Sequence, residues 1–419
     1  MKKHLLTICT LALFIISTQA QIIIDTVSLG AGYLNQKYYS LQNDEQGTQD
    51  KDNWDIGFEI TGYAATISAN TQKANFAIYK APYSIANYTT IDTAGISSWP
   101  MLYNSDATWD IGAFNRGANL SNPNDLGWGV YDVNTHIITG DSCYVIKLSA
   151  TSFKKIKLDN LSGGIYTFEY ANINGTSSHT ATINKSNYAG KNFVYYDMIS
   201  NAVINREPVS ANWDLTFGRY TAFISTPYPV VGVMSNKGVK VAQADNVASP
   251  ATYNNWAAHA LNTNITEIGH DWKYFNLSSN AWWLSQDSVY FVKDKPNNVW
   301  KMRFTAFGGS ANGNFIFSKE KMSAVGIADI AGNIISKVTV YPNPSNKNNT
   351  TLLFSTENGT SKVLVSIIDL NGKLISEQTI ITRNGINQHA LNTSMLNSGI
   401  YFIQINAGSY NTTQKLIIQ

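Results

Sequence analysis

Cysteine is almost absent from this chain. Its 419 residues contain two cysteines, and one of them, Cys9, lies in the apolar run at the amino end. Without that run Cys143 stands alone, which excludes an intramolecular disulfide. A reactive thiol needs a base beside it, and strand periodicity does not place His136, the nearest histidine in the mature chain, next to Cys143. We therefore expect Cys143 to be buried and unreactive.

Charge is also scarce, because Asp, Glu, Lys and Arg make up 14% of the chain. Removing Lys2 and Lys3 with the amino-terminal segment leaves 28 basic residues against 28 acidic ones. The sequence has no basic tail and no stripe of lysines. This balance argues against nucleic acid and anionic lipid as partners.

Long apolar runs are missing after the first 20 residues. The amino end has two lysines, an apolar run over residues 5–16 and a small-residue site at 17–20, which together predict a secretory signal peptide over residues 1–20, cleaved before Gln21. The run is too short to span a bilayer, so no transmembrane segment is predicted.

Catalytic and metal-binding motifs are missing as well. The chain has no Gly-x-Ser-x-Gly, no His-Glu-x-x-His and no phosphate-binding glycine loop. The aspartates at 50, 52 and 55 lack the spacing of a calcium loop. We predict no catalytic residue and no metal site. Paired carboxylates on distant strands would not be visible in sequence, so an extracellular hydrolase stays open as a second alternative.

The patterns that are present belong to β-strands. Trp300, Met302 and Phe304 alternate with Lys301 and Arg303, as in a half-buried antiparallel strand. Helix signals are weak, and the best of them, at residues 252–261, allows about two turns. The fold class predicted is all-β with antiparallel sheets.

Several sequence blocks occur twice in the same order, which predicts duplicated domains. Asn-Trp-Asp-Ile-Gly-Phe at 53–58 returns as Asn-Trp-Asp-Leu-Thr-Phe at 212–217, and a tyrosine-rich strand precedes each copy. Two further pairs are residues 141–148 with 287–293 and residues 153–158 with 300–304. We predict one domain over residues 21–190 and a second over 191–324. The repeated Asp55 and Asp214 are interpreted as structural acceptors of backbone hydrogen bonds.

The carboxyl end forms a separate segment. A small-residue linker is predicted at 325–336, and residues 337–419 alternate as the strands of a small immunoglobulin-like β-sandwich. The motifs Val-Tyr-Pro-Asn-Pro at 340–344, Ile-Asp-Leu-Asn-Gly at 368–372 and Ser-Gly-Ile-Tyr at 398–401 resemble the C-terminal sorting domain of the type IX secretion system of Bacteroidetes. The resemblance implies export to the cell surface or the medium, with the type IX secretion machinery as a partner.

The duplicated blocks resemble the HmuY family of Bacteroidetes haem-binding proteins. In the second copy the resemblance rests on residues 213–217, 272–275, 290–292 and 300–304, and in two copies it extends over residues 21 to about 322. It implies two tandem antiparallel β-rich units that hold haem between two axial side chains. The best candidate pair is His259 and His270, and the alternative is that both are surface or hydrogen-bonded histidines.

Three tryptophans suggest a different ligand. Trp256, Trp282 and Trp283 could stack on sugar rings, or they could be buried in a sandwich core. The function predicted is thus a non-enzymatic exported ligand binder, with haem as the possible cofactor. A surface adhesin or glycan-binding protein is the alternative.

Overall fold

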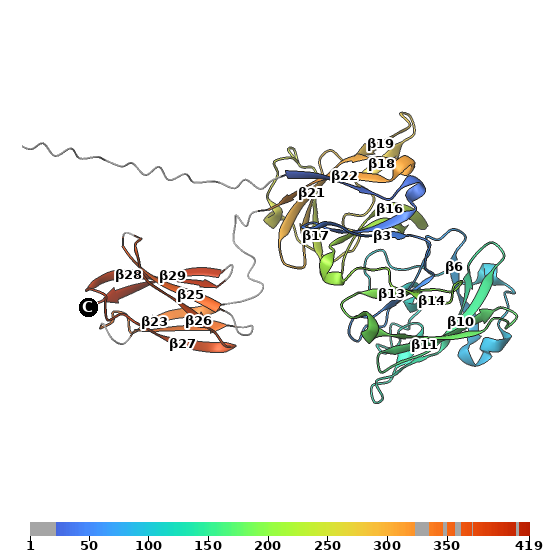
Figure 1. Cartoon of the computed structure of the whole chain (residues 1–419), viewed down its shortest axis with the longest axis horizontal. Coiled ribbons are helices and arrows are strands. Elements are labelled where there is room, and N and C mark those ends of the chain that lie inside the picture. The colour runs from blue at the N-terminus through green and yellow to red at the C-terminus, as the bar shows by residue number, and fades with distance from the viewer. Residues whose placement is uncertain (1–21, 323–334, 347–349, 357–361, 371, 408–409) are drawn as a thin grey trace, which may run out of the picture. The chain divides into compact units, whose positions relative to one another are not determined.

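The computed structural model describes residues 22–322, 335–346, 350–356, 362–370, 372–407 and 410–419 (Figure 1). The chain forms two compact units, divided between residues 323 and 324. Strands make up nearly all of the regular structure, which confirms the all-β prediction. The predicted signal peptide and most of the predicted linker lie outside the described residues.

The first unit contains two lobes. The first lobe, residues 54–204, has a seven-stranded and a four-stranded antiparallel sheet. The larger sheet contains β12 (His179–Asn184), β11 (Ile165–Asn172), β10 (Phe153–Ser162), β8 (Ile138–Gly140), β7 (Gly129–Tyr131), β9 (Ser142–Lys147) and β6 (Ala77–Ser84). The smaller sheet contains β14 (Ala202–Ile204), β13 (Phe193–Asp197), β4 (Ile56–Glu59) and β5 (Ile67–Ala69).

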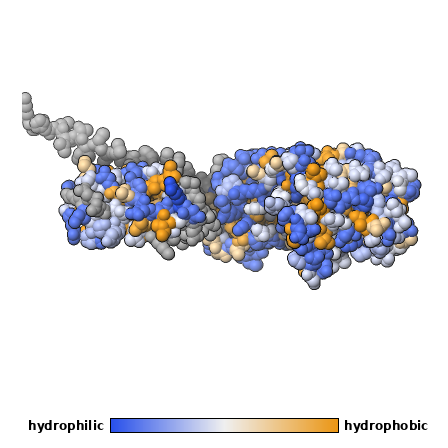
Figure 2. Space-filling view, turned by 90° about the horizontal axis from the view of Figure 1, so that it is seen from below, coloured by the Kyte–Doolittle hydropathy of each residue, from blue (hydrophilic) through white to orange (hydrophobic). Residues whose placement is uncertain are grey.

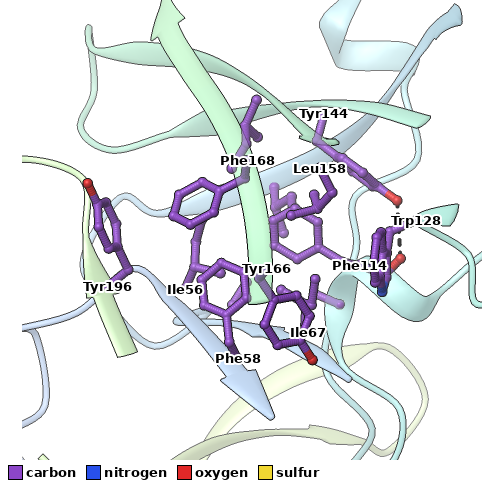
Figure 3. Close-up of a cluster of buried hydrophobic side chains, with 14 of the residues drawn as sticks. Ile56, Phe58, Ile67, Phe114, Trp128, Tyr144, Leu158, Tyr166, Phe168 and Tyr196 are labelled. Carbon is purple, nitrogen blue, oxygen red and sulfur yellow. Dashed lines mark hydrogen bonds between the residues drawn. The ribbon is translucent and has the colours of Figure 1, made fainter. Parts of the chain in front are cut away.

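Aromatic side chains fill the space between these two sheets (Figure 3). Phe58 from β4 packs on Phe168 of β11 with ring centroids 5.0 Å apart. The Tyr144 hydroxyl donates to the Phe114 carbonyl at 3.1 Å, so this polar group is buried with a partner. Cys143 is buried, as predicted, and burial raises the pKa of its thiol to about 11.

The second lobe combines residues 22–50 with residues 213–321. Its five-stranded sheet contains β1 (Ile22–Ser28), β22 (Asn314–Lys321), β21 (Val299–Phe307), β20 (Val289–Lys293) and β17 (Lys240–Ala244). Its four-stranded sheet contains β16 (Pro227–Ser235), β15 (Leu215–Phe223), β2 (Asn35–Ser40) and β3 (Asp44–Asp50). A hairpin of β18 (Lys273–Asn276) and β19 (Ala281–Leu284) completes the lobe. Side chains from both sheets form one core between them.

The strand pairing crosses the boundary predicted at residue 190. The tyrosine-rich strand β2 pairs with β15, which follows Trp213 and Asp214 of the second motif. The later tyrosine-rich strand β13 pairs with β4, which follows the first Trp-Asp motif. Each tyrosine strand thus joins the lobe of the other sequence copy, and β1 joins the second lobe through β22. A linear reading of the repeat does not reveal this exchange, because pairing between distant strands leaves no local signal.

The two Trp-Asp motifs make the same contacts in both lobes. Asp55 Oδ2 accepts the Met198 backbone N–H at 2.8 Å, and Asp214 Oδ2 accepts the Leu41 backbone N–H at 2.8 Å. Both aspartates are buried. The structural interpretation of these carboxylates is confirmed, since each holds the end of a tyrosine strand beside its partner.

The remaining loops cover the lobes with little helix. The segment predicted as the best helix, residues 252–261, contains only one 3-10 turn, Trp256–Ala258, so that prediction is wrong. Its apolar residues follow the surface of a sheet instead of one helical stripe. In the view of Figure 2, hydrophobic residues are scattered among hydrophilic ones on the visible surface.

The second unit is a β-sandwich, as predicted. One sheet contains β23 (Ile335–Tyr341), β24 (Thr350–Thr356) and β27 (Gly385–Leu391). The other contains β26 (Leu374–Ile381), β25 (Lys362–Asp369), β28 (Gly399–Ala407) and β29 (Tyr410–Ile418). Apolar side chains from both sheets form its own core.

Candidate functional site

An open pocket lies at one end of the second lobe, where the β18–β19 hairpin meets β15, β16 and the end of β21. Its volume of about 320 Å³ falls in the range of small-molecule sites. Aromatic and basic side chains dominate its lining: Tyr33, Tyr228, Trp282 and Phe307, with Arg219, His270 and Lys273. We call it the aromatic pocket.

The hairpin places two neighbouring tryptophans on opposite faces, because side chains alternate along a strand. Trp282 packs edge-on against Phe307, with ring centroids 5.0 Å apart, and lines the pocket. Trp283 pairs with Tyr274 on the other face and is 49% exposed. Of these two predicted ligand-binding residues, Trp282 lines the pocket and Trp283 does not.

A glycine holds Trp282 close to the body of the lobe. Gly309 has φ of +60°, and a Cβ at this position would lie 2.7 Å from Trp282 Nε1. Any larger residue would be strained in this conformation and would also displace the indole. Gly309 belongs to the short turn α1 (Gly309–Asn312), which connects β21 to β22.

Lys273 is buried beneath the aromatic side chains. Its Nζ donates to the Val231 carbonyl at 2.7 Å and to the His270 carbonyl at 3.3 Å. The same ammonium lies 4.7 Å from the ring centroid of Phe307. Burial lowers the pKa of Lys273 to about 7, and the nearby Asp271 opposes this change. A small change in surroundings can therefore switch its charge near neutral pH.

His270 borders the same pocket. Its Nδ1 lies 3.1 Å from the Tyr220 hydroxyl, so the two groups share a hydrogen bond whose direction depends on the imidazole tautomer. Burial lowers the pKa of His270, while Asp271 acts in the opposite direction. Burial therefore favours the neutral imidazole, which offers hydrogen bonding more than charge.

Arg219 on β15 is the third basic residue. Within the described part of the chain its guanidinium makes no hydrogen bond and no ion pair, and its Nε is buried without a partner. Arg219 also borders a second, smaller cavity of about 100 Å³, together with Trp54 and Trp109. A guanidinium offers five donors, and here they are unused by the protein.

No carboxylate lines the aromatic pocket in the described residues. Asp271 neighbours it in sequence, but its side chain is exposed. The pocket therefore combines stacking surfaces with donors and leaves the negative charge to be supplied by a ligand.

The other predicted site residues lie elsewhere. His259 Nε2 lies 2.8 Å from the Tyr253 hydroxyl, and its ring stacks on Phe291 at 6.0 Å. Phe291 alternates with Tyr290 and Val292, which point into the core, so His259 lies on the outer face of the five-stranded sheet.

His270 lies on the other side of the same core. Its partner Tyr220 belongs to β15, three residues after the inward-facing Phe217, and so points away from the core on the outer face of the four-stranded sheet. The structure thus brings His270 and Trp282 together and leaves His259 across the core. Trp256, partly buried, packs against the apolar cluster around Phe291 with Tyr253.

Sequence reasoning missed Arg219 and Lys273. A signal existed for Arg219, because it continues the inward face of Leu215 and Phe217 on β15, where a charged residue is unexpected. No comparable signal marks Lys273, which follows the buried Trp272 at the start of a short strand. Its burial depends on contacts with distant segments.

Two further features of the described residues bear on function. They contain no group of three or more His, Cys, Asp or Glu side chains placed to hold a metal ion. None of their helices is long and apolar enough to cross a membrane.

Comparison with known proteins identifies the carboxyl-terminal unit. Residues 339–419 match the family described as the secretion system C-terminal sorting domain. The predicted resemblance of this segment is confirmed, and the protein is an exported cargo of the type IX secretion system. The resemblance of residues 21–322 to the HmuY family stays a prediction.

Other comparisons add little. No curated protein matches the chain. Among solved structures, the trimeric ectodomain of the C. elegans fusion protein EFF-1 shows 10% identity over 96% of this chain and 95% of its own, with a TM-score of 0.17. Dimeric latent PorU from Porphyromonas gingivalis shows 10% identity over 94% of this chain and 34% of its own, with a TM-score of 0.18. The chain thus spans about a third of PorU. TM-scores this low do not indicate a shared fold.

Proposed function

We propose that this exported protein is a non-enzymatic glycan binder, at the cell surface or in the medium, and that the aromatic pocket is its binding site. The observation that carries the proposal is the meeting of Trp282, Phe307 and two tyrosines with three basic side chains in one open pocket. Aromatic faces suit the apolar faces of sugar rings, and the donors suit their hydroxyls.

Binding is favoured over hydrolysis by the lining itself. Glycoside hydrolysis in most families needs two carboxyl groups across the scissile bond. The described lining of the pocket contains none. Lys273 is held by two backbone carbonyls under the aromatic side chains, which suits a fixed donor.

Haem is the less supported ligand. Haem iron takes axial ligands such as His, Met, Cys or Tyr, and a two-histidine site needs both side chains in one cleft. His259 and His270 lie on outer faces of opposite sheets. A haem held by this pair has no support in the arrangement of the lobe, and a haemin titration without a saturable Soret shift would exclude haem.

A tryptophan exchange tests glycan binding. We expect Trp282→Ala to weaken the signal of the labelled protein on a glycan array by about tenfold, because stacking on an aromatic side chain contributes about 1 kcal/mol or more. Trp283→Ala is the matched control, since this neighbour faces away from the pocket. Equal losses in both variants, or no binding to any glycan by the unaltered protein, would contradict the proposal.

A further inference from the structure

We propose that the aromatic pocket selects acidic sugars and that Arg219 is the residue that binds their carboxylate or sulfate group. This inference rests on the proposed glycan binding and adds the chemical class of the ligand. It starts from the lack of any partner for the Arg219 guanidinium in the described residues.

A buried guanidinium atom without a partner is unusual. Buried polar groups in proteins are nearly always hydrogen-bonded, and an unpaired buried donor is costly. Arg206, in the segment between β14 and β15, also has a buried Nε without a partner among the described residues, but its two terminal nitrogens donate to Gln36 at 2.7 Å and to the Asp50 carbonyl at 2.9 Å. Arg219 has no such contacts, so its donors are available to a ligand.

The first lobe has an apolar residue at the position that corresponds to Arg219. When the two Trp-Asp motifs are aligned, Trp54 corresponds to Trp213 and Phe58 to Phe217. In the same alignment Ile60 corresponds to Arg219. Ile60 is buried in the core of the first lobe. The second lobe therefore has a guanidinium where the first lobe has a core isoleucine. Since the first lobe forms the same strand with isoleucine, the strand itself does not require a charged residue here.

The surroundings of Arg219 favour an anion over any other ligand. The planar fork of arginine matches carboxylate and sulfate oxygens through two parallel hydrogen bonds. Lys273 supplies a second amine at the same pocket, and no carboxylate in the described lining competes for either group. The burial that lowers the pKa of Lys273 also means that a bound anion would restore its charge.

Together these groups define the ligand. A sugar ring stacks against Trp282 or Phe307 while an acidic substituent on the ring or on its neighbour meets Arg219. A neutral sugar would satisfy the aromatic side chains and leave the guanidinium unpaired. Discrimination between acidic and neutral sugars is therefore expected to come from one residue.

Calorimetric titration of the purified full-length protein tests this selection with two matched pairs of probes. The first pair is an oligogalacturonate and the same oligosaccharide with its carboxyl groups reduced to alcohols. The second pair is a dextran oligosaccharide with and without sulfate groups. We expect the acidic member of at least one pair to bind about tenfold more tightly, the scale of one charge-assisted hydrogen-bond pair. The pair that responds identifies carboxylate or sulfate as the recognised group.

Arg219→Ile gives the second lobe the isoleucine that the first lobe has at the corresponding position. This variant should lose the preference for acidic oligosaccharides and keep the binding of neutral ones. Arg219→Gln serves the same purpose if the isoleucine variant does not fold. Lys240→Gln is the control, because it removes one exposed charge on β17, away from the pocket. Binding without acidic preference, or a preference that survives both Arg219 variants, would overturn the inference and leave glycan binding intact. Binding to no oligosaccharide would reject both.

Discussion

The two lobes of the first unit are built on the same strands but differ at the end of the sandwich. Both hold a tyrosine strand through a buried aspartate, and both have a β-bulge at the same place, after Leu158 in the first lobe and after Phe304 in the second. The buried aspartates and the β-bulges are thus the same in both lobes. The positions near the end of the sheets are not, since Ile60 and Leu161 in the first lobe correspond to Arg219 and Phe307 in the second.

The residues at this end of the two lobes distinguish the shared scaffold from the candidate site. In the first lobe Ile60 and Leu161 pack into the apolar core, and Ile60 also borders an open hollow of about 630 Å³ whose other lining residues are mostly glycine and polar. In the second lobe the same positions line an open pocket, and the β18–β19 hairpin adds Trp282 and Lys273 to it. The aromatic hairpin and the inward-facing arginine are thus features of this end of the second lobe, whereas the first lobe has apolar side chains at the corresponding positions. Three measurements bear directly on this contrast.

Removal of residues 22–50 should have the largest effect. These residues provide β1, β2 and β3, so the second lobe would lose an edge strand from one sheet and two strands from the other. We expect the second lobe to lose hydrogen-exchange protection throughout β20, β21 and β22, while β10 and β11 in the first lobe keep theirs. Retained protection in both lobes would show that the exchange of strands is dispensable.

The paired aspartates should give an intermediate effect. Asp214→Ala leaves the buried Leu41 N–H without an acceptor, which costs about 1 to 3 kcal/mol of unfolding free energy. Asp55→Ala leaves the Met198 N–H unpaired and also removes the nearer of the two carboxylates that pair with Lys73, at 2.8 Å against 3.9 Å for Asp197, so its cost should be the larger of the two.

Urea unfolding of both variants at pH 7 measures this order. Asp92→Ala is a suitable control, because Asp92 lies in an exposed loop. An equal or reversed order would mean that the Lys73 ion pair adds nothing to the first lobe.

The titration of Lys273 should give the smallest effect. Its pKa is lowered to about 7 in the folded lobe, so between pH 7 and its unfolded value near 10.5 the unfolded chain binds the extra proton. Stability should therefore rise with pH, by about 1 to 2 kcal/mol between pH 7 and 8.5. Titratable groups that line the same pocket are Tyr33, Tyr228, Arg219 and His270, and Asp271 is the charged neighbour that acts on this amine.

Lys273→Met should flatten this rise in urea unfolding measured across the same pH range. Lys240→Gln, on an exposed site, should keep the slope of the unaltered protein. An unchanged slope in Lys273→Met would show that another group is responsible.

Local patterns in the sequence predicted most of the scaffold. The alternation around Trp300, the twice-occurring Trp-Asp motif and the sorting segment each depend on neighbouring residues, and each was confirmed. The helix predicted at 252–261 failed because its apolar residues pack against a sheet surface. The exchange of tyrosine strands was not predicted, since two equivalent partners for each strand look the same in sequence.

The candidate site was predicted only in part. Trp282 and His270 were named and meet in the pocket, while His259 and Trp256 lie on another face of the lobe. Arg219 was missed because its interest lies in the lack of a hydrogen-bond partner for its guanidinium in the described part of the chain. Lys273 was missed because its interest lies in the burial of its amine away from water. Such absences arise from tertiary packing and have no sequence pattern.

The pairing of β1 with β22 also places the carboxyl end of the second lobe far from its pocket. Ile22 pairs with Glu320 at one end of this ribbon, and Ser28 pairs with Asn314 at the other, about 20 Å away for strands of this length. Lys321, the last residue of β22, lies at the Glu320 end, whereas Phe307 and the residues that follow Ser28 lie at the pocket end. Since every residue that lines the pocket lies between Tyr33 and Phe307, a cut in the chain after Lys321 would remove none of them.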